Sequence, residues 1–286
     1  MIVSASYRTD IPAFYAEWFA RRLAEGFALV GNPYGGAEYR VDLRPGAVAG
    51  WVFWTKNLGP FRPQLEAVRA RGEPFVVQYS ITGLPTALEK AVPRPEAAVG
   101  HMRELARRFG PRAAVWRYDP VVLTDLTPPA WHRETFARLA GGLRGATDEV
   151  TVSFLQLYRK TGRNLRLAAE RHGLSWRLPE PEEQRALLDD LTAIAADHGM
   201  ALTLCTQPGL GGVPARCIDA ARLSDVAGRP LPARTKGNRP GCLCAESHDI
   251  GAYDGCPHGC VYCYAVSDHA RAQARLKAHD PAAPKL

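Results

Sequence analysis

The chain has 286 residues, carries 36 Lys and Arg against 29 Asp and Glu for a net charge of +7, and is 46% hydrophobic. This is enough for one full hydrophobic core, so we expect a single domain over residues 1–286. The sequence has no secretory pattern at its start and no apolar stretch near the roughly 20 residues of a membrane helix, which predicts a cytoplasmic protein without membrane contact. In a reducing compartment the seven cysteines are not expected to form disulfides, so metal ligands or free thiols remain.

Runs of β-branched and aromatic residues alternate with segments of helical period along most of the chain. The runs that predict strands are residues 1–6, 51–55, 74–82, 113–118, 149–157 and 200–206. Apolar stripes at helical spacing predict helices over residues 98–109, 132–143 and 187–194, and a further helix is expected over residues 265–280. Several strands are apolar almost throughout, as parallel strands covered on both faces are. The order of elements therefore predicts an α/β fold, a (β/α) barrel that is complete or partial.

Polar side chains follow the carboxyl ends of these strands, where barrel enzymes place their active sites. The binding or catalytic candidates are Arg8, Asp10, Lys56, Asn57, Arg117 and Asp119. Each of them also has a structural interpretation. Asp10 can cap a helix, Lys56 and Asn57 can be turn residues, and Arg117 can pair with Asp119. Their recurrence at strand after strand favours a polar pocket.

The segment 229–264 differs in composition from the rest of the chain, with much Gly and Pro, little periodicity and five of the seven cysteines. Such a segment is ordered only if something such as a metal orders it. Cys256, Cys260 and Cys263 follow a C-x3-C-x2-C spacing. A zinc ion and an iron–sulfur cube are both usually held by four protein ligands. With only three thiolates, a zinc site needs His258 or a distant group as its fourth ligand. A cube held by three thiolates has one iron with an open coordination position.

This spacing, with Tyr262 directly before the last cysteine, resembles the signature of radical S-adenosylmethionine (SAM) enzymes. The resemblance implies that Cys256, Cys260 and Cys263 hold a [4Fe-4S] cluster whose fourth iron chelates SAM, with Tyr262 beside it. It further implies cleavage of SAM to a 5′-deoxyadenosyl radical that abstracts hydrogen from a substrate, and an electron donor such as a ferredoxin or flavodoxin. The polar candidates would then bind SAM or substrate. The aromatic side chains that would shield the radical from water are Trp54, Tyr79 and Tyr118.

The sequence departs from the radical SAM pattern in two ways. The motif lies near the end of this sequence, whereas in that family it follows the first strand. A circular permutation would reconcile the two, with residues 256–280 as the usual first loop and helix and residues 1–6 as the next strand. Radical SAM enzymes also have a glycine-rich motif that binds the SAM amino group. In this sequence only GGAE at residues 35–38 resembles it loosely, and GGAE is more typical of a turn.

The whole chain also resembles the bacterial domain-of-unknown-function 1848 family, which implies no particular reaction. The residues that carry this resemblance are 6–19, 53–57, 116–120 and 242–265.

The remaining cysteines are Cys205, Cys217, Cys242 and Cys244, and four thiolates are enough to close a metal site completely. Cys242 and Cys244 form a C-x-C pair and are expected ligands, which favours a second, auxiliary [4Fe-4S] cluster. Cys205 in an apolar strand and Cys217 at the start of an expected helix fit buried thiols equally well. A structural zinc site that includes His248 or His258 is the competing interpretation.

The substrate class stays open between a small molecule and a nucleotide. The basic charge permits nucleic acid as a partner, yet the sequence has no nucleic-acid fold motif and no basic run with interleaved aromatic residues. The alternative to an enzyme is a non-catalytic protein whose cysteines bind zinc or an iron–sulfur cluster and whose basic surface binds nucleic acid.

Overall fold

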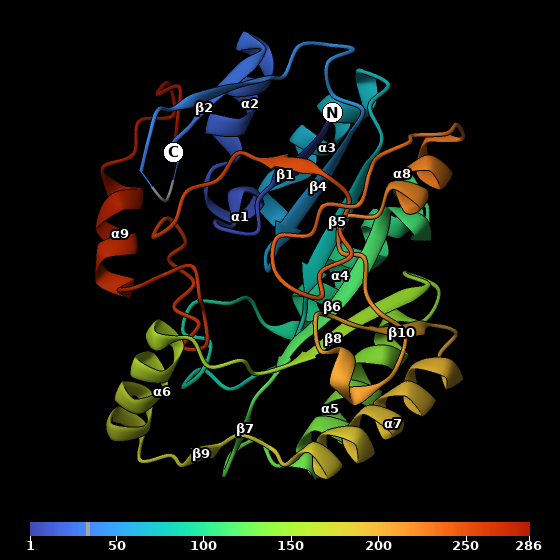
Figure 1. Ribbon diagram of the computed structural model, residues 1–286, viewed down its shortest axis with the longest axis vertical. Coiled ribbons are helices and arrows are strands. Elements are labelled where there is room, and N and C mark those ends of the chain that lie inside the picture. Colours follow the sequence, from blue (N-terminus) through green and yellow to red (C-terminus); the bar gives the residue numbers. More distant parts are fainter. Residues whose placement is uncertain (33–34) are drawn as a thin grey trace.

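The computed structural model describes residues 1–32 and 35–286, and its centre is a seven-stranded sheet with the order β10-β8-β6-β5-β4-β1-β11 (Figure 1). Every strand pair in this sheet is parallel. Its strands are β1 (Ile2–Ala5), β4 (Gly50–Thr55), β5 (Phe75–Ser80), β6 (Ala114–Val121), β8 (Glu149–Phe154), β10 (Ala201–Leu204) and β11 (Ser247–Asp249). The α/β class and each predicted strand are confirmed. The edge strand β11 was not predicted, because its three polar residues have no strand pattern.

The helices follow the strands as expected of a parallel sheet. They are α1 (Ile11–Phe14), α2 (Ala16–Glu25), α3 (Arg62–Ala70), α4 (Pro95–Phe109), α5 (Pro129–Leu143), α6 (Arg159–His172), α7 (Pro181–Asp197), α8 (Ala220–Ala227) and α9 (His269–Lys277). The predicted stripes correspond to α4, α5 and α7. The last helix is shorter than predicted, because Asp268 caps its first turn by accepting from the N–H of Arg271 at 2.8 Å. No helix among the described residues has the length and apolar character needed to cross a membrane.

Two small antiparallel pairs lie outside the main sheet. They are β2 (Phe27–Val30) with β3 (Tyr39–Asp42), and β7 (Leu123–Thr124) with β9 (Trp176–Arg177). Gly35 and Gly36 lie between β2 and β3 with φ of 86° and 115°. GGAE therefore belongs to the connection of a hairpin, and its turn interpretation is confirmed.

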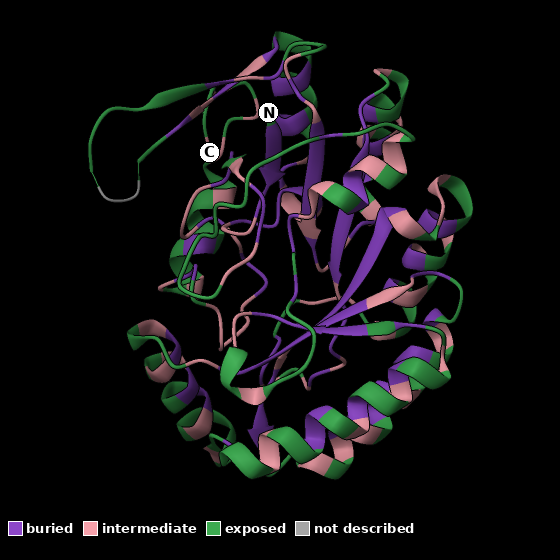
Figure 2. Cartoon of the chain, turned by 45° about the vertical axis from the view of Figure 1, so that its right-hand side comes forward, coloured by how far each residue is buried: buried purple, intermediate pink, exposed green. Residues whose placement is uncertain are grey.

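The two faces of the main sheet carry separate cores, because side chains alternate between the faces along each strand. One face carries Phe53, Tyr79 and Tyr118 and joins the large cluster that the helices cover. Figure 2 shows these strands buried behind helices that are exposed on their outer sides. The hydroxyl of Tyr79 contacts Nδ1 of His101 at 3.2 Å, and that of Tyr118 contacts Nδ1 of His132 at 2.7 Å. Tyr79 and Tyr118 thus point into the helix-covered core, which corrects their expected role as a shield for the pocket.

We call the other face of the sheet the inner face. Val52, Val76 and Val115 pack there against Leu223 of α8 and Leu231. Trp54 is partly buried against the same cluster, so among the three aromatic candidates it alone lies on this face. The inner face is covered by residues from Cys205 onward, α8 among them, rather than by a layer of long helices. This is where the cysteine-rich part of the chain meets the sheet.

The segment 229–246 runs over the inner face and is held there by backbone hydrogen bonds. The N–H of Ala245 donates to the carbonyl of Ile218 at 2.8 Å, and the N–H of Lys236 donates to the carbonyl of Cys244 at 2.9 Å. The chain then enters β11, which pairs with β1 through Ile2 and Ser247. After β11 it crosses to α9, drawn in red in Figure 1.

Residues at the end of the chain return to its first helices and strands. The indole N–H of Trp18 donates to the carbonyl of Ala283 at 2.9 Å, and the N–H of Leu29 donates to the carbonyl of Pro284 at 2.8 Å. The N and C marks of Figure 1 accordingly lie in the same part of the molecule. The segment after β11 is therefore packed beside the start of the fold.

Candidate functional site

The C-x3-C-x2-C loop lies against the segment that follows β5. The N–H of Val261 donates to the carbonyl of Leu88 at 3.0 Å, and the N–H of Ala91 donates to the carbonyl of His258 at 2.8 Å. Between these two bonds, Cys260 forms an isolated antiparallel bridge with Glu89. These backbone contacts hold the three-cysteine loop at the carboxyl edge of the sheet, as a barrel active site requires.

Asp10 connects three parts of this edge. One carboxylate oxygen, Oδ1, accepts from the N–H of Ala13 at 3.0 Å and caps α1. The other, Oδ2, accepts from the N–H of Lys56 at 2.7 Å and contacts Nε2 of His258 at 2.8 Å. Nδ1 of His258 lies 2.9 Å from the carbonyl of Ala91, so both ring nitrogens have oxygen partners. The capping role of Asp10 is confirmed, and His258 positions the loop instead of offering a nitrogen to a metal.

Glu89 is the central polar side chain of the site, although no sequence pattern points to it. Its Oε1 accepts from Nζ of Lys56 at 2.8 Å and from the hydroxyl of Thr82 at 2.8 Å, and it also accepts from the hydroxyl of Tyr262. Glu89 is only 4% exposed. Burial by itself lowers the pKa of Lys56, but Glu89 and the Cys260 sulfur outweigh it and hold that pKa above its ordinary value. One carboxylate thus fixes Lys56 and Tyr262 beside the cysteines.

Two of the three sulfurs, those of Cys256 and Cys263, receive backbone hydrogen bonds, which favour their thiolate forms. The N–H of Ala265 donates to Sγ of Cys263 at 3.3 Å, and the backbone N–H groups of Asp10 and His258 donate to Cys256. Burial raises the pKa of Cys256, Cys260 and Cys263 in the metal-free protein. The three thiols affect each other electrostatically, and no sulfur–sulfur hydrogen bond joins them in the part of the chain that the structure describes.

The loop between the first two cysteines is closed by Gly259. This residue has a φ of 72°, and a Cβ atom at its position would lie 3.0 Å from both Cβ of Lys90 and Nε2 of His269. A side chain here would be strained and crowded at once, so the C-x3-C turn depends on glycine. Within residues 1–32 and 35–286, no group of three or more His, Cys, Asp or Glu side chains is already arranged around a metal position. The donor set nevertheless fits a thiolate-ligated cluster, since three cysteines share one loop and two of their sulfurs accept backbone N–H bonds.

Asn57 does not join this polar group. Its Oδ1 accepts from the N–H of Gly59 at 3.1 Å and closes the turn after β4. The turn interpretation is therefore confirmed for Asn57. Lys56, its neighbour, instead extends its side chain to Glu89.

Arg117 and Asp119 form the expected ion pair, but they lie on the inner face. Nη1 of Arg117 donates to Sγ of Cys217 at 3.0 Å and to Oε1 of Gln78 at 3.2 Å. Burial by itself raises the pKa of Asp119, and the charge of Arg117 with a hydrogen bond from Ser153 brings it below its ordinary value. This pair thus lies beside Cys217, one of the four cysteines outside the C-x3-C-x2-C motif, while Lys56 and Asp10 lie beside the motif itself.

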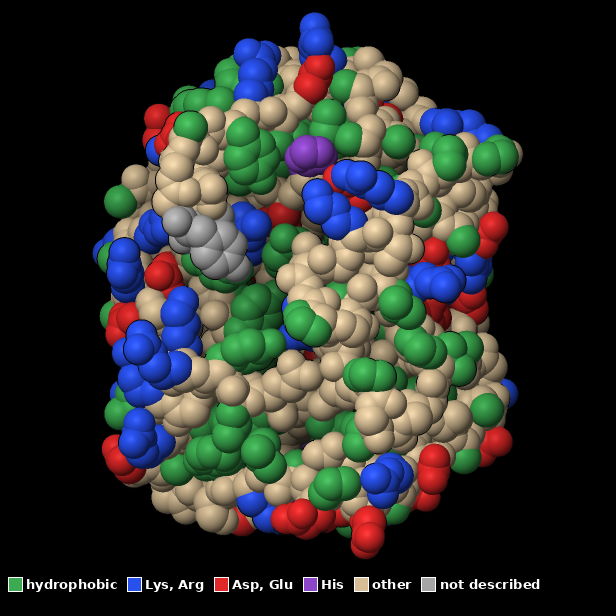
Figure 3. Space-filling view, viewed as in Figure 1, with side chains coloured by type: hydrophobic (Ala, Val, Ile, Leu, Met, Phe, Trp, Pro, Cys, Tyr) green, Lys and Arg blue, Asp and Glu red, His purple; other side chains and the backbone are tan. Residues whose placement is uncertain are grey.

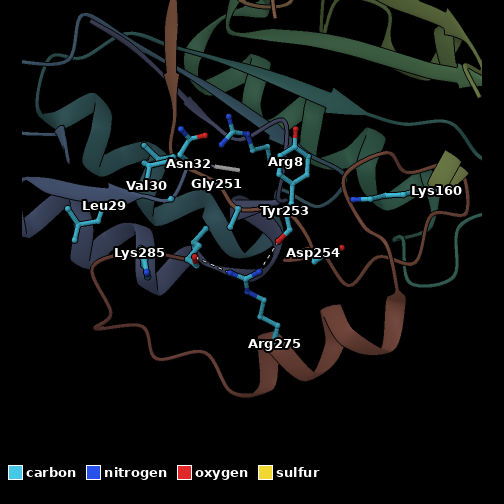
Figure 4. Close-up of a pocket in the computed structure, with 14 residues that line it drawn as sticks. Arg8, Leu29, Val30, Asn32, Lys160, Gly251, Tyr253, Asp254, Arg275 and Lys285 are labelled. Atoms are coloured by element: carbon cyan, nitrogen blue, oxygen red, sulfur yellow. Dashed lines mark hydrogen bonds between the residues drawn. The ribbon is translucent and has the colours of Figure 1, made fainter. Parts of the chain in front are cut away.

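Arg8 lies beside a cavity of about 480 Å³, a volume that suits a small molecule (Figure 4). Its guanidinium lies 5.5 Å from the ring centroid of Tyr7 and 5.4 Å from that of Tyr253, and its Nε is 3.8 Å from Oδ1 of Asp249. The other cationic side chains of the lining are Lys160, Arg275 and Lys285. Figure 4 shows Arg275 hydrogen-bonded to the backbone of Tyr253, at 2.9 Å. Asp254 also lines the cavity, and Asp249 and Glu38 pair with Arg8 and Lys285. Basic side chains still outnumber acidic ones in the lining, which suits an anionic group.

Asp249 at the end of β11 is a second buried carboxylate that sequence reasoning missed. It accepts from the hydroxyls of Ser4 at 2.8 Å and Ser6 at 2.7 Å, and from the N–H of Gly251 at 3.0 Å. Burial raises its pKa above the ordinary value, although Arg8 opposes the effect. Its role is to tie β11 to β1 and to position Arg8.

Residues 2–265 match the family model described as "Domain of unknown function (DUF1848)". The chain belongs to this family. No curated protein and no solved structure matches it. The DUF1848 match includes all seven cysteines and ends before α9. This family description names no reaction.

Proposed function

We propose that this DUF1848 protein is a radical SAM enzyme whose cluster is held by Cys256, Cys260 and Cys263. The observation that carries the proposal is the position of the three-cysteine loop, which is packed against the carboxyl edge of a parallel sheet beside Lys56 and Glu89. Parallel α/β sheets bind their ligands at this edge. Three protein thiolates on a [4Fe-4S] cluster leave one iron free for a substrate-derived ligand.

The order of elements at this edge supports a circularly permuted, partial barrel. β11 precedes the loop, the loop precedes α9, and β1 is the next strand in the sheet. This is the strand, loop, helix, strand order that radical SAM enzymes have at the start of their barrel. Residues 283–284, which follow α9, pack against Trp18 of α2 and Leu29 of β2, and this return of the chain to its first elements is compatible with such a permutation.

The protein's own share of the chemistry is to hold the reactants and exclude water. When bound, the cluster would supply the electron that converts SAM into methionine and a 5′-deoxyadenosyl radical. Glu89 orients Lys56 and Tyr262, and Asp10 with His258 fixes the loop. Asp10, Glu89 and His258 are buried, Lys56 and Tyr262 are partly buried, and all five are already paired, so they can keep their positions while substrate binds.

The cavity at Arg8 supports binding of a small anionic molecule rather than a long nucleic acid. On the face drawn in Figure 3, Lys and Arg lie at several separate places with Asp and Glu among them. A nucleic-acid surface usually concentrates basic side chains into one patch or stripe. The carboxylate of SAM or an anionic substrate is the ligand that this cavity fits.

Anaerobic turnover with SAM tests the proposal. The purified protein, reduced with dithionite, is expected to contain iron and sulfide and to release 5′-deoxyadenosine from SAM. Cys260→Ala should abolish both the cluster absorbance and the product, whereas Cys217→Ser, outside the three-cysteine loop, should retain the absorbance. A colourless wild-type protein that does not cleave SAM would instead support the non-catalytic alternative.

A further inference from the structure

The four cysteines outside the motif lie together on the inner face. Cys205 directly follows β10, Cys217 precedes α8, and Cys242 and Cys244 come from the segment 229–246. Sγ of Cys217 lies 3.8 Å from Sγ of Cys205. Cys244 forms side-chain hydrogen bonds with both Cys217 and Cys242. Three separate parts of the chain thus bring four thiols into one continuous row.

This row is largely removed from solvent. The exposed fractions are 8% for Cys205, 5% for Cys217 and 4% for Cys244, and Cys242 is half-buried. Cys217 does not begin a helix, because α8 starts later, at Ala220. A buried thiol by itself needs no partner, but four in mutual contact are the complete ligand set of a tetrathiolate metal site.

Cationic and backbone donors surround these sulfurs. Arg117 donates from Nη1 to Sγ of Cys217 at 3.0 Å, and Arg239 donates from Nη2 to Sγ of Cys205 at 3.6 Å. The N–H of Ile218 donates to Sγ of Cys244 at 3.4 Å. Four thiolates around a divalent ion carry a net charge of −2, and buried charge is stable only when it is compensated. The two guanidinium groups supply that compensation.

The spacing of two of these sulfurs favours a single ion over a cluster. A tetrahedral zinc ion with Zn–S bonds of about 2.3 Å places its sulfurs about 3.8 Å apart. The Cys205–Cys217 contact has this length. A [4Fe-4S] cube puts iron and sulfide between its ligands and keeps their sulfurs further apart. Contact between thiols therefore fits one ion better than the auxiliary cluster expected from the sequence.

We propose that Cys205, Cys217, Cys242 and Cys244 bind one structural zinc ion. The four thiols are joined in a row, and among the described residues no group of three or more potential ligands is already arranged around a metal position. Side-chain rotation closes the site as zinc binds. Each thiol that is still protonated releases its S–H proton to solvent, four Zn–S bonds form, and no electron is transferred.

The ion would fasten the segment 229–246 to the sheet. This segment has little regular structure. It supplies two of the proposed zinc ligands, Cys242 and Cys244, which lie next to a tightly packed turn. A Cβ atom on Gly237 would lie 2.1 Å from the carbonyl oxygen of Cys242, so the two backbones already touch. Because β11 follows directly, an ordered segment also fixes the strand that leads into the three-cysteine loop.

Metal analysis of the full chain, produced with both iron and zinc and purified anaerobically, tests this site. Wild type should contain about one zinc and about four iron atoms per chain. Cys217→Ser should lose the zinc and keep the iron, whereas the matched Cys260→Ser should lose the iron and keep the zinc. Zinc X-ray absorption should find four sulfur ligands at about 2.3 Å.

The competing outcomes are distinct. About eight iron atoms without zinc, halved by Cys217→Ser, would overturn the zinc proposal in favour of a second cluster. Zinc that survives both Cys217→Ser and Cys242→Ser would also overturn it. If Cys217→Ser fails to fold, the half-buried Cys242→Ser gives the same test. An absence of iron with zinc present would refute the proposed enzyme and leave the zinc site intact, so the two proposals fail separately.

Discussion

The two groups of cysteines differ in how the chain assembles them. Cys256, Cys260 and Cys263 share one short loop, in which Cys256 and Cys263 accept backbone N–H bonds. The other four come from three segments, touch each other and are contacted by Arg117 and Arg239. The difference teaches that identical side chains can prepare different metal sites. On the two proposals above, the local loop would leave one ligand position open, and the buried tertiary cluster would supply all four ligands.

The largest expected effect is that a substitution in one group of cysteines removes the metal bound by that group while the other group keeps its metal. Cys260→Ala removes a thiolate that a three-ligand cluster cannot replace, so we expect 5′-deoxyadenosine formation to fall to background, at least about 100-fold. The measurement is product per chain by chromatography, together with iron and zinc content. Retained product formation, or joint loss of both metals, would contradict the separation of the two groups.

Zinc removal should loosen one segment and spare the sheet. After treatment with a chelator, we expect protease cleavage within residues 229–246 to become about tenfold faster, because metal ligation is what orders this segment. Mass spectrometry of the fragments locates the cuts, and readdition of zinc should restore protection. Cuts spread evenly over β4, β5 and β6 would show instead that the ion supports the whole fold.

Glu89→Gln probes the polar group beside the three-cysteine loop. The change leaves the Lys56 ammonium without its carboxylate, and the side chains of Lys56 and Glu89 are only 12% and 3% exposed. Breaking a buried pair in this way costs about 3 kcal/mol of unfolding free energy. Lys56→Met with Glu89→Gln should recover much of that stability, measured by urea unfolding.

The same double variant separates positioning from packing. We expect SAM cleavage to stay at least about tenfold low even where stability returns, because Tyr262 has lost its carboxylate partner. The iron content of each variant serves as the control, since a positioning role leaves the cluster in place. Full recovery of activity along with stability would show that Glu89 acts through packing alone.

The smallest expected effect is a difference in thiol reactivity in the metal-free protein. The hydrogen bond from Cys244 lowers the pKa of Cys242 to about 6, whereas burial raises the pKa of Cys256, Cys260 and Cys263. Cys242 is therefore a thiolate above about pH 6 and is protonated below it. Iodoacetamide should label Cys242 first at pH 7.5, and its rate should fall as the pH drops through 6. Labelling of Cys260 before Cys242 would contradict this expected order of thiol reactivity.

Much of the fold could be predicted because its signals are local. The alternation and apolar runs that mark β1, β4, β5, β6, β8 and β10 depend on neighbours a few residues apart. The C-x3-C-x2-C motif is equally local, since one loop holds all three thiols. Immediate neighbours in the sequence also indicated three local roles. Asp10 was expected to cap a helix, Asn57 to belong to a turn, and Arg117 to pair with Asp119.

Only the tertiary structure decided which distant side chains meet. Glu89 reaches Lys56 and Tyr262 because the loop after β5 pairs with the three-cysteine loop, a contact that no spacing encodes. Tyr79 and Tyr118 could not be assigned to a face until the sheet showed which side the helices cover. Cys205 and Cys217 became neighbours of Cys244 through packing on the inner face. The sequence by itself thus determined the elements and the local motif, because these depend on short-range geometry, whereas the partners of each buried charge and thiol depend on chain segments that only folding brings together.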